Sequence, residues 1–420
     1  MTIYQLLPRL WGKGKLSDIK DGTFNHLKSL GVSHLWCTGI IRHATGEDFV
    51  KGDAGSPYAI SDYYDVNPYL ADNPEYRLAE FREFVSRVHD AGLKLIMDFV
   101  PNHVAKNYDS SKLPLFDWCD YDWTDTRKIN YSADGAYEKM LDILRFWAEY
   151  GVDGFRCDMV ELVPVDFFSW AIRTLKQDYP DLIFIAEVYE KCNYRRYIEE
   201  AGFDFLYDKS GLYDTLRGIV LSGGTARGIT WNWQFLGDMQ PHMLNFLENH
   251  DEERFPFASG CSAALAASAL LNTAPFMIYF GEEIGVDASE SDNKRTTIFN
   301  FAKIDGLQRL YSYAENGSKL TPAEREYLDG FRSVTSLAAE PVVTKGLIHD
   351  LCYCNESTPG FNPDRHFAFL RHYGESTVIV FCNFDSSPAS LELNIPDLGF
   401  RCPPTRIDAA SGEAVIVKVS

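Results

Sequence analysis

Short runs of apolar residues alternate along the chain with longer stretches in which apolar residues recur at helical spacing. In the stretch 135–150, for example, apolar side chains such as Met140 and Leu144 fall on one face of a helix. Helices are also expected near 17–30 and 74–91. The apolar runs interpreted as strands are 2–7, 33–37, 93–100, 152–158, 182–188, 204–208, 243–248 and 276–280. Eight strands, most of them separated by helical segments, predict a closed (β/α)8 barrel of the TIM type.

The pattern changes towards the C-terminus. Thr321 with Glu324 three residues later, and Pro322 between them, predicts a capping box and a helix that runs to about 338. Beyond it, short apolar runs come in pairs that we interpret as hairpins: 366–373 with 377–384, and 406–410 with 413–419. The sequence therefore predicts a barrel over 1–338 and a small all-β sandwich domain over 339–420.

Charge and composition narrow the range of partners. The chain has 420 residues, with 40 Lys and Arg against 60 Asp and Glu, which gives a formal net charge of −20. Neither nucleic acid nor an anionic membrane surface is an expected partner, because both attract clusters of basic residues and none is visible. Aromatic residues make up 14% of the chain, which is compatible with an aromatic-rich core or with a ligand that stacks on rings.

Cysteine usage and the absence of long apolar segments favour a cytoplasmic protein. Nine cysteines are scattered without regular spacing, and the pair Cys352 and Cys354 has no second pair with which to form a zinc site. Scattered thiols suit a reducing compartment. The first residues do not resemble a signal peptide, and the longest apolar stretch, 263–280, is broken by polar residues and Pro275.

Polar residues gather where four of the predicted strands end. Asp98 to His103 follow the third strand, Arg156 and Asp158 end the fourth, Glu187 ends the fifth, and Glu248 to Asp251 follow the seventh. Active sites of (β/α)8 barrels lie at the C-terminal ends of the strands. Charged groups at one rim are costly to desolvate unless they are used, so the pattern indicates a catalytic site.

These segments resemble the short sequence regions of the α-amylase family of retaining glycoside hydrolases. DFVPNH (98–103), GFRCD (154–158), AEVY (186–189) and ENHD (248–251) occur in the family's order. SPYAISDYYDVNP (56–68) and APFMIYFGEEIG (274–285) extend the resemblance over roughly residues 1–305. The resemblance implies the barrel fold and activity on α-glucosidic bonds.

The resemblance also implies roles for individual residues. Asp158 would be the nucleophile, Glu187 the general acid/base and Asp251 the group that stabilises the transition state. Arg156 would keep Asp158 ionised. The residues implied to bind the sugar are Tyr58, which would stack beneath its ring, His103 and His250. Asp98 and Asn102 would support the loop after the third strand.

The residue types suit this chemistry whatever the family is called. Cleavage with retention needs one carboxylate to attack and a second, protonated carboxyl to protonate the leaving oxygen, about 5 Å apart. The oxocarbenium-like transition state carries positive charge, which a third carboxylate can stabilise.

Two departures from the family bear on calcium. Met159 to Leu162 stand where many α-amylases have a Lys-His pair that helps to bind calcium, and the excursion after the third strand, 104–130, is shorter than usual. We therefore expect no required cofactor and no metal ligands, and only a doubtful role for calcium.

Other classes of function remain open at this point. A metal-dependent hydrolase could use Asp98, His103, His250, Asp251 and Glu252 as ligands. A non-catalytic sugar-binding relative and a glycosyl-transferring enzyme acting on α-glucans, sucrose or trehalose are further alternatives. The sequence favours a cytoplasmic α-amylase-like glycosidase that acts on oligosaccharides or polysaccharides with α-1,4 bonds.

Overall fold

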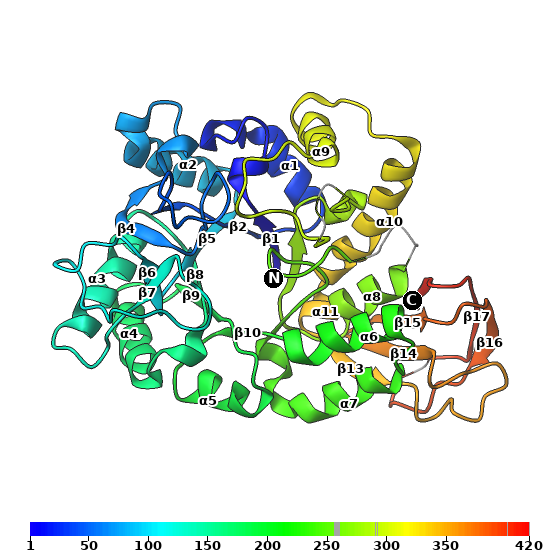
Figure 1. The fold of residues 1–420 in the computed structure, drawn as a ribbon. Helices are drawn as coiled ribbons and strands as arrows, with labels where there is room; N and C mark the ends of the chain where they lie inside the picture. Colours follow the sequence, from blue (N-terminus) through cyan, green and yellow to red (C-terminus); the bar gives the residue numbers. More distant parts are fainter. Residues whose placement is uncertain (256–260, 290, 292, 401, 420) are drawn as a thin grey trace.

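Eight parallel strands close into a barrel, and helices surround it (Figure 1). The structure is a computed structural model, and it describes residues 1–255, 261–289, 291, 293–400 and 402–419. The barrel strands are β1 (Thr2–Leu6), β2 (His34–Cys37), β5 (Lys94–Phe99), β8 (Gly154–Cys157), β9 (Ile183–Ala186), β10 (Phe205–Tyr207), β11 (Met243–Phe246) and β12 (Phe276–Tyr279). Each strand pairs with the next along the chain, and β12 pairs with β1. All eight predicted strands are confirmed, with ends that differ by at most two residues.

The helices that cover the barrel bury an apolar face against the strands. In α3 the predicted positions Met140 and Leu144 are buried, as the helical spacing requires. The helices are α1 (Asp21–Ser29), α2 (Arg77–Asp90), α3 (Ala136–Glu149), α4 (Val165–Asp178), α5 (Tyr194–Glu199), α6 (Asp214–Ser222), α7 (Arg227–Leu236), α8 (Ser262–Leu270), α9 (Asp305–Asn316) and α10 (Pro322–Ala338). The capping box is confirmed at the start of α10, where Thr321 and Glu324 bond to each other's backbone N–H groups.

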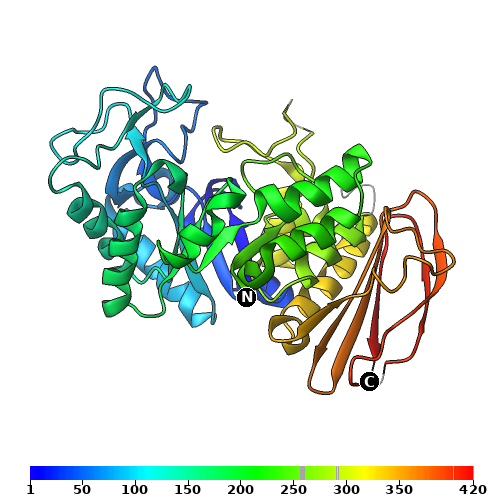
Figure 2. The same cartoon turned by 90° about the horizontal axis from the view of Figure 1, so that it is seen from below.

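Two excursions rise from the barrel rim, and each contains a small antiparallel ladder (Figure 2). The first pairs β3 (Ile41–His43) with β4 (Ile60–Val66) in a segment where no strand is predicted from the sequence. The second pairs β6 (His103–Ala105) with β7 (Thr126–Lys128) within the short excursion predicted after the third strand. At its base the Lys128 ammonium lies 2.9 and 3.0 Å from the two carboxylate oxygens of Asp120.

The C-terminal part is built from two sheets with an apolar layer between them. A four-stranded sheet contains β13 (Leu347–Asp350), β14 (His366–Tyr373), β15 (Ser376–Asn383) and β18 (Ala414–Val419), and a two-stranded sheet contains β16 (Ala389–Leu393) and β17 (Thr405–Ala409). The all-β prediction is confirmed for this part, although a short helix, α11 (Pro341–Thr344), precedes the first strand.

One of the two predicted hairpins is wrong. β14 and β15 pair as expected, but β17 pairs with β16 while β18 pairs with β15 in the other sheet. The chain between β17 and β18 crosses from one sheet to the other, and Asn383 fixes this crossing by donating from its side chain to the Ala410 carbonyl at 2.8 Å. Ile407 can then bury its side chain in the layer between the sheets.

A buried arginine joins the C-terminal sheets to the barrel. Arg371 on β14 donates to the carbonyl oxygen of Leu271, between α8 and β12, at 2.8 Å. The same guanidinium donates to the carbonyl oxygens of Val343 and Gly346. Burial lowers the pKa of Arg371 to about 10. The contact surface between the two parts therefore holds a cation that is satisfied by backbone dipoles.

Candidate active site

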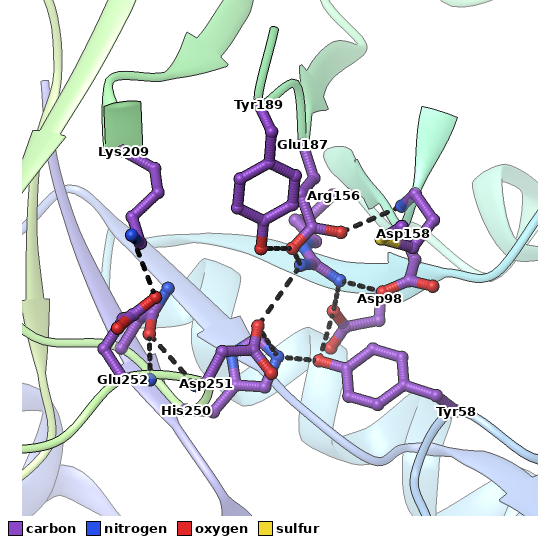
Figure 3. A network of polar contacts seen from close by, with 12 residues as sticks. Tyr58, Asp98, Arg156, Asp158, Glu187, Tyr189, Lys209, His250, Asp251 and Glu252 are labelled. Carbon is purple, nitrogen blue, oxygen red and sulfur yellow. Dashed lines mark hydrogen bonds and ion pairs between the residues drawn. The ribbon is translucent and has the colours of Figure 1, made fainter. Parts of the chain in front are cut away.

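Four acidic side chains converge at one end of the barrel (Figure 3). Asp98 lies on β5, while Asp158 follows β8, Glu187 follows β9, and Asp251 comes a few residues after β11. The C-terminal ends of parallel strands meet at the same rim, so residues 153 positions apart become neighbours. The predicted convergence of these strand ends is present in the structure.

Arg156 lies at the centre of the carboxylates. Its side chain is fully buried, with Nη1 donating to Asp158 Oδ1 at 2.7 Å and Nη2 lying 2.7 Å from Glu187 Oε1. Nη1 is 3.5 Å from Asp98, and Nη2 is 3.8 Å from Asp251. The resemblance implies that Arg156 acts on Asp158, and its position beneath the carboxylates suits a group that holds all of them together. Such a buried cation is stabilised only because several anions surround it.

Three donors hold the Glu187 carboxylate in place. Besides the ion pair with Arg156, Tyr189 Oη donates to Oε1 at 3.0 Å, and the Met159 backbone N–H donates to Oε2 at 2.9 Å. Met159 has φ 45° and ψ 45°, a left-handed conformation that is unusual for a residue with a side chain. This conformation accompanies the bond from the end of β8 to Glu187, so the turn ties the two carboxylates to each other.

Burial and the Arg156 charge act in opposite directions on the pKa of Asp158. Burial raises the pKa of Asp158 well above its usual range, and the negative charges of Glu187 and Asp251 add to the effect. Arg156 lowers the pKa of Asp158, as expected, but the effect of burial is larger. Arg156 therefore opposes the effect of burial on the Asp158 pKa, which is the direction expected from the sequence.

Tyr58 and His250 form one wall of the site. Their rings stack with centroids 5.2 Å apart, and the Tyr58 hydroxyl contacts His250 Nε2 and also lies 3.3 Å from Asp98 Oδ1. Gln5 lies 2.7 Å from the other ring nitrogen of His250. Burial and the Arg156 charge lower the pKa of His250 well below its usual range, so its ring is neutral at neutral pH.

Asp98 stands behind this wall. It accepts a hydrogen bond from the Trp36 indole at 3.0 Å, and burial raises its pKa to about 6. These contacts are compatible with the supporting role that the sequence suggests for Asp98.

His103 lies at the start of β6, beside the second excursion. Its ring is 5.1 Å from the Trp123 ring, and burial lowers its pKa to about 4. Asn102 lies 3.3 Å from its Nδ1 and also donates to Asp120 at 2.8 Å. The backbone of Tyr58 lies within hydrogen-bonding reach of the His103 ring, which links this histidine to the wall.

Glu248 does not belong to the rim site, although the sequence groups it with the other acids of the seventh strand. It turns to Arg254, with Nη1 2.6 Å from Oε2, and its other oxygen accepts from the Phe255 backbone. A carboxylate three residues before Asp251 thus points into a separate cluster. The four-residue motif 248–251 therefore contributes one carboxylate to the Arg254 cluster and another to the rim site.

Several residues that border the site were not predicted from the sequence. Tyr189 bonds to Glu187, and Lys209 lies 3.4 Å from Glu252, which borders Asp251 (Figure 3). Trp36 and Gln5 lie on barrel strands, where their burial hides them among apolar neighbours. Only Tyr189 carried a signal, because it falls two residues after Glu187 and points to the same side of an extended chain.

No group of three or more His, Cys, Asp or Glu side chains is placed to hold a metal ion within the residues described above. The ligands suggested for a metal-dependent hydrolase have other partners: Asp98 bonds to Trp36, and Glu252 pairs with Lys209. Among the described residues there is also no helix of the length and apolar character that a bilayer crossing requires.

The fold and the site together define a (β/α)8-barrel protein with an arginine-centred carboxylate site at its rim. Residues 11–121 match the family model for the α-amylase catalytic domain. The chain is 26% identical to alpha-amylase MalA of Haloarcula japonica over 298 residues, which cover 66% of this chain and 42% of MalA. It is 24% identical to an intracellular maltogenic amylase of Bacillus subtilis, with 65% of this chain and 49% of that protein covered.

The fold also matches a solved structure over its whole length. The maltogenic α-amylase AmyB of Thermotoga neapolitana has a TM-score of 0.73 at 24% identity, with 100% of this chain and 96% of that chain covered. The chain is therefore similar to proteins of the α-amylase family of glycoside hydrolases over these regions. It spans about half the length of the two relatives compared by sequence.

Proposed function

We propose that this protein is a retaining glycoside hydrolase that cleaves α-glucosidic bonds, most favourably α-1,4 bonds, in maltooligosaccharides or starch-like glucans. The observation that carries the proposal is the Arg156 guanidinium, whose two terminal nitrogens each lie 2.7 Å from a different carboxylate, Asp158 and Glu187. Two carboxylates on one guanidinium lie close together, which favours the separation of about 5 Å found in retaining enzymes over roughly 6.5–9.5 Å in inverting ones.

In this mechanism Asp158 attacks the anomeric carbon and Glu187 protonates the leaving oxygen. Glu187 then removes a proton from water, which releases the sugar from Asp158 with its anomeric configuration retained. Asp251, whose side chain is 35% exposed, faces the open side of the site and stabilises the positive charge of the transition state. Arg156 positions all three carboxylates, since it pairs with each of them.

The remaining predicted residues bind the sugar. Tyr58 presents its ring to the sugar face, and His250, stacked on Tyr58 and neutral at neutral pH, can donate or accept a hydrogen bond to a hydroxyl. His103 binds a neighbouring hydroxyl from the second excursion. The names of the relatives, α-amylase and maltogenic amylase, support an α-glucan as substrate.

The test of the mechanism is covalent labelling together with Asp158→Asn. The amide keeps the shape of Asp158 but cannot attack, so turnover is expected to be lost while folding and sugar binding remain. A fluorinated α-glucosyl fluoride is expected to label wild-type protein on the peptide that contains Asp158. Labelling of Glu187 or Asp251, or first products of β configuration by NMR, would contradict the mechanism.

The substrate is tested with a ladder of maltooligosaccharides, with sucrose and trehalose assayed alongside. Products resolved over time are expected to become shorter, as hydrolysis requires. The appearance of products longer than the starting oligosaccharide would show that sugar acceptors compete with water and that transfer is the main reaction.

Calcium is not needed for this activity in our proposal, and no other cofactor is invoked. Among the described residues no group of three or more His, Cys, Asp or Glu side chains is placed to hold a metal ion, and Lys128 already supplies positive charge to Asp120 in the second excursion. EDTA is expected to leave both activity and melting temperature unchanged. A large loss of either that added calcium restores would overturn this part.

The cytoplasm is the proposed location, and oligosaccharides or polysaccharides are the proposed partners. All nine cysteines have free thiols, which suits a reducing compartment. A relative whose name describes an intracellular enzyme supports the same placement. Cell fractionation with an antibody against this chain tests it, and activity recovered outside the cells would contradict it.

A further inference from the structure

A groove of about 460 Å³ lies between helix α7 of the barrel and the C-terminal sheets, away from the carboxylate network. Arg227, Thr230, Trp231 and Gln234 line it from α7. Their spacing of i, i+3, i+4 and i+7 places them on one face of the helix. The opposite wall is formed by β13 and the segment that follows it, next to α7 in Figure 1. A groove of this size falls within the range of small-molecule binding sites.

Two aromatic rings stand exposed at this groove. Trp231 on α7 is 59% exposed and Tyr353, after β13, is 68% exposed. Large aromatic side chains are usually buried because exposure of their apolar surface costs free energy. Flat, exposed rings on both walls provide surfaces on which a ligand with apolar faces can stack.

Polar groups in the groove have capacity that the described residues do not use. The indole nitrogen of Trp233 and Nε2 of His349 are shielded from solvent and have no hydrogen-bond partner among the described residues. Both residues line the groove. A shielded polar atom without a partner costs free energy, and a ligand hydroxyl reaches these two atoms only if the side chains that cover them move.

Cross-links between the two walls keep the groove in shape. Thr230 donates to Asp350 at 2.6 Å, and Arg227 donates to Glu356 at 2.6 Å. Glu356 accepts this bond with one oxygen and keeps lone pairs for a ligand, whereas Asp350 also accepts from the Cys352 backbone with its other oxygen. The walls thus present donors and acceptors side by side, between two exposed rings.

We propose that this groove is a second binding site, separate from the catalytic one, for a neutral oligosaccharide segment of an α-glucan. Sugars combine apolar ring faces with hydroxyls that both donate and accept, which matches stacking surfaces flanked by mixed polar groups. An anionic ligand is disfavoured, because Asp350 and Glu356 face it and Arg227 is already paired with Glu356. The choice of α-glucan rests on the proposed function, whereas the sugar chemistry rests on the groove itself.

Helix α7 connects this groove to the catalytic rim. On its other side Asn232 donates to Asp208, just after β10, at 3.0 Å and lies 3.3 Å from Lys191. Lys191 comes four residues after Glu187. A polymer held in the groove is therefore tethered to the body that carries the catalytic carboxylates, which raises its effective concentration at the cleft.

The experiment compares binding and cleavage in the double variant Trp231→Ala with Tyr353→Ala. Affinity electrophoresis in gels that contain amylose measures polymer binding, with Asp158→Asn as the background so that the polymer stays intact. The double variant is expected to bind amylose about tenfold more weakly, as the loss of two stacking surfaces implies. In protein that keeps Asp158, the kcat/KM of the double variant on 4-nitrophenyl maltotrioside, a short substrate, is expected to be unchanged, while its rate on amylose falls.

Tyr76→Ala is the matched control, because Tyr76 is 65% exposed and lies far along the chain, before α2. It is expected to bind amylose as strongly as the parent. Each single variant, Trp231→Ala and Tyr353→Ala, is tested as well, and melting temperatures identify any variant that fails to fold.

The outcomes separate this proposal from the proposed function. Unchanged amylose binding in the double variant overturns the second site, even if short substrates are cleaved. Gel filtration gives a second check. If the parent elutes as a dimer and the double variant as a monomer while amylose binding is unchanged, the groove is an interface between copies and the second site is overturned. Failure of the parent to cleave any maltooligosaccharide overturns the proposed function, while weaker amylose binding in the double variant would still support the groove.

Discussion

The barrel contains two clusters in which a buried arginine is surrounded by carboxylates. In the first, Arg156 holds Asp98, Asp158, Glu187 and Asp251. In the second, Arg254 pairs with Glu248, and two further buried acids, Glu282 and Glu283, lie nearby. Both clusters contain fully buried charges and carboxyl groups with raised pKa values.

The difference between the clusters is access. Asp251 and Tyr189 at the first cluster are 35% and 36% exposed, so a substrate can reach the carboxylates. In the second, Glu248, Glu282 and Glu283 are at most 1% exposed. Its acids are bound by protein groups instead: Glu283 accepts from Tyr4 at 2.7 Å and lies 2.9 Å from His26. Perturbed pKa values alone therefore do not mark a catalytic site, and an opening to solvent must accompany them.

The largest effect is expected on activity, where a substitution in the first cluster should matter and one in the second should not. Glu187→Gln removes the proton donor and is expected to lower kcat/KM on maltooligosaccharides by about 10²–10⁴-fold. Activity on α-glucosyl fluoride, whose leaving group needs no protonation, is expected to persist. Glu282→Gln in the second cluster is the matched control and is expected to leave both rates unchanged. Equal losses on the two substrates in Glu187→Gln would remove the general-acid role.

Removal of the central arginine separates the clusters by stability. Arg254→Met leaves Glu248 buried without its partner and is expected to lower the free energy of unfolding by about 3–5 kcal/mol, measured by urea denaturation. Glu282→Gln is expected to cost much less, because burial already raises the pKa of Glu282 and favours its neutral form. A larger loss in Glu282→Gln than in Arg254→Met would show that Glu282 is charged in the folded protein.

The pH dependence of stability tests how burial acts on the first cluster. The pKa of Asp98 is raised to about 6, so the folded protein binds this proton more tightly than the unfolded chain does. Its stabilising contribution is present in full below about pH 4 and is lost as the pH rises through 6. Wild type is therefore expected to gain on the order of 2–3 kcal/mol relative to Asp98→Asn between pH 7 and 4.

Unfolding of the two proteins at both pH values measures this difference, and the comparison within each pH cancels groups that both share. A difference that stays constant across the range, or that moves in favour of Asp98→Asn at low pH, would contradict the raised pKa.

The smallest effect concerns the wall of the open cluster. Tyr58→Ala is expected to lower kcat/KM by at least about tenfold, because burial of an aromatic ring against a sugar contributes on the order of 1–3 kcal/mol. Tyr58→Phe keeps the ring but loses the contacts of the hydroxyl with His250 and Asp98, so a smaller loss is expected. Steady-state kinetics on one maltooligosaccharide compares them. Equal losses would assign the effect to the hydroxyl.

The sequence predicted the elements that depend on local pattern. Periodicity and turn residues predict the eight strands, the capping box of Thr321 and Glu324 and the β14–β15 hairpin. These features depend on residues that lie close together in the sequence. The convergence of Asp158, Glu187 and Asp251 followed from the rule that strand ends share a rim.

What could not be predicted depends on long-range competition. Glu248 and Asp251 are three residues apart, yet their side chains enter different clusters, because Glu248 pairs with Arg254 and Asp251 pairs with Arg156. The pairing of β17 with β16 rather than β18 is decided by which sheet buries Ile407. The raised pKa of Asp158 depends mainly on its burial, which no local motif reports.

The buried Arg371 limits how the C-terminal sheets can be exchanged between this protein and another. Its guanidinium joins the carbonyl oxygens of Leu271 in the barrel and of Val343 and Gly346 in the connecting segment. A chimaera that takes the C-terminal sheets from another protein would leave the Leu271 carbonyl without its donor. The sheets produced alone would expose the Arg371 guanidinium, which is buried in the whole protein. The barrel and the C-terminal sheets therefore have to be exchanged together, or the exchanged sheets must retain an arginine at position 371.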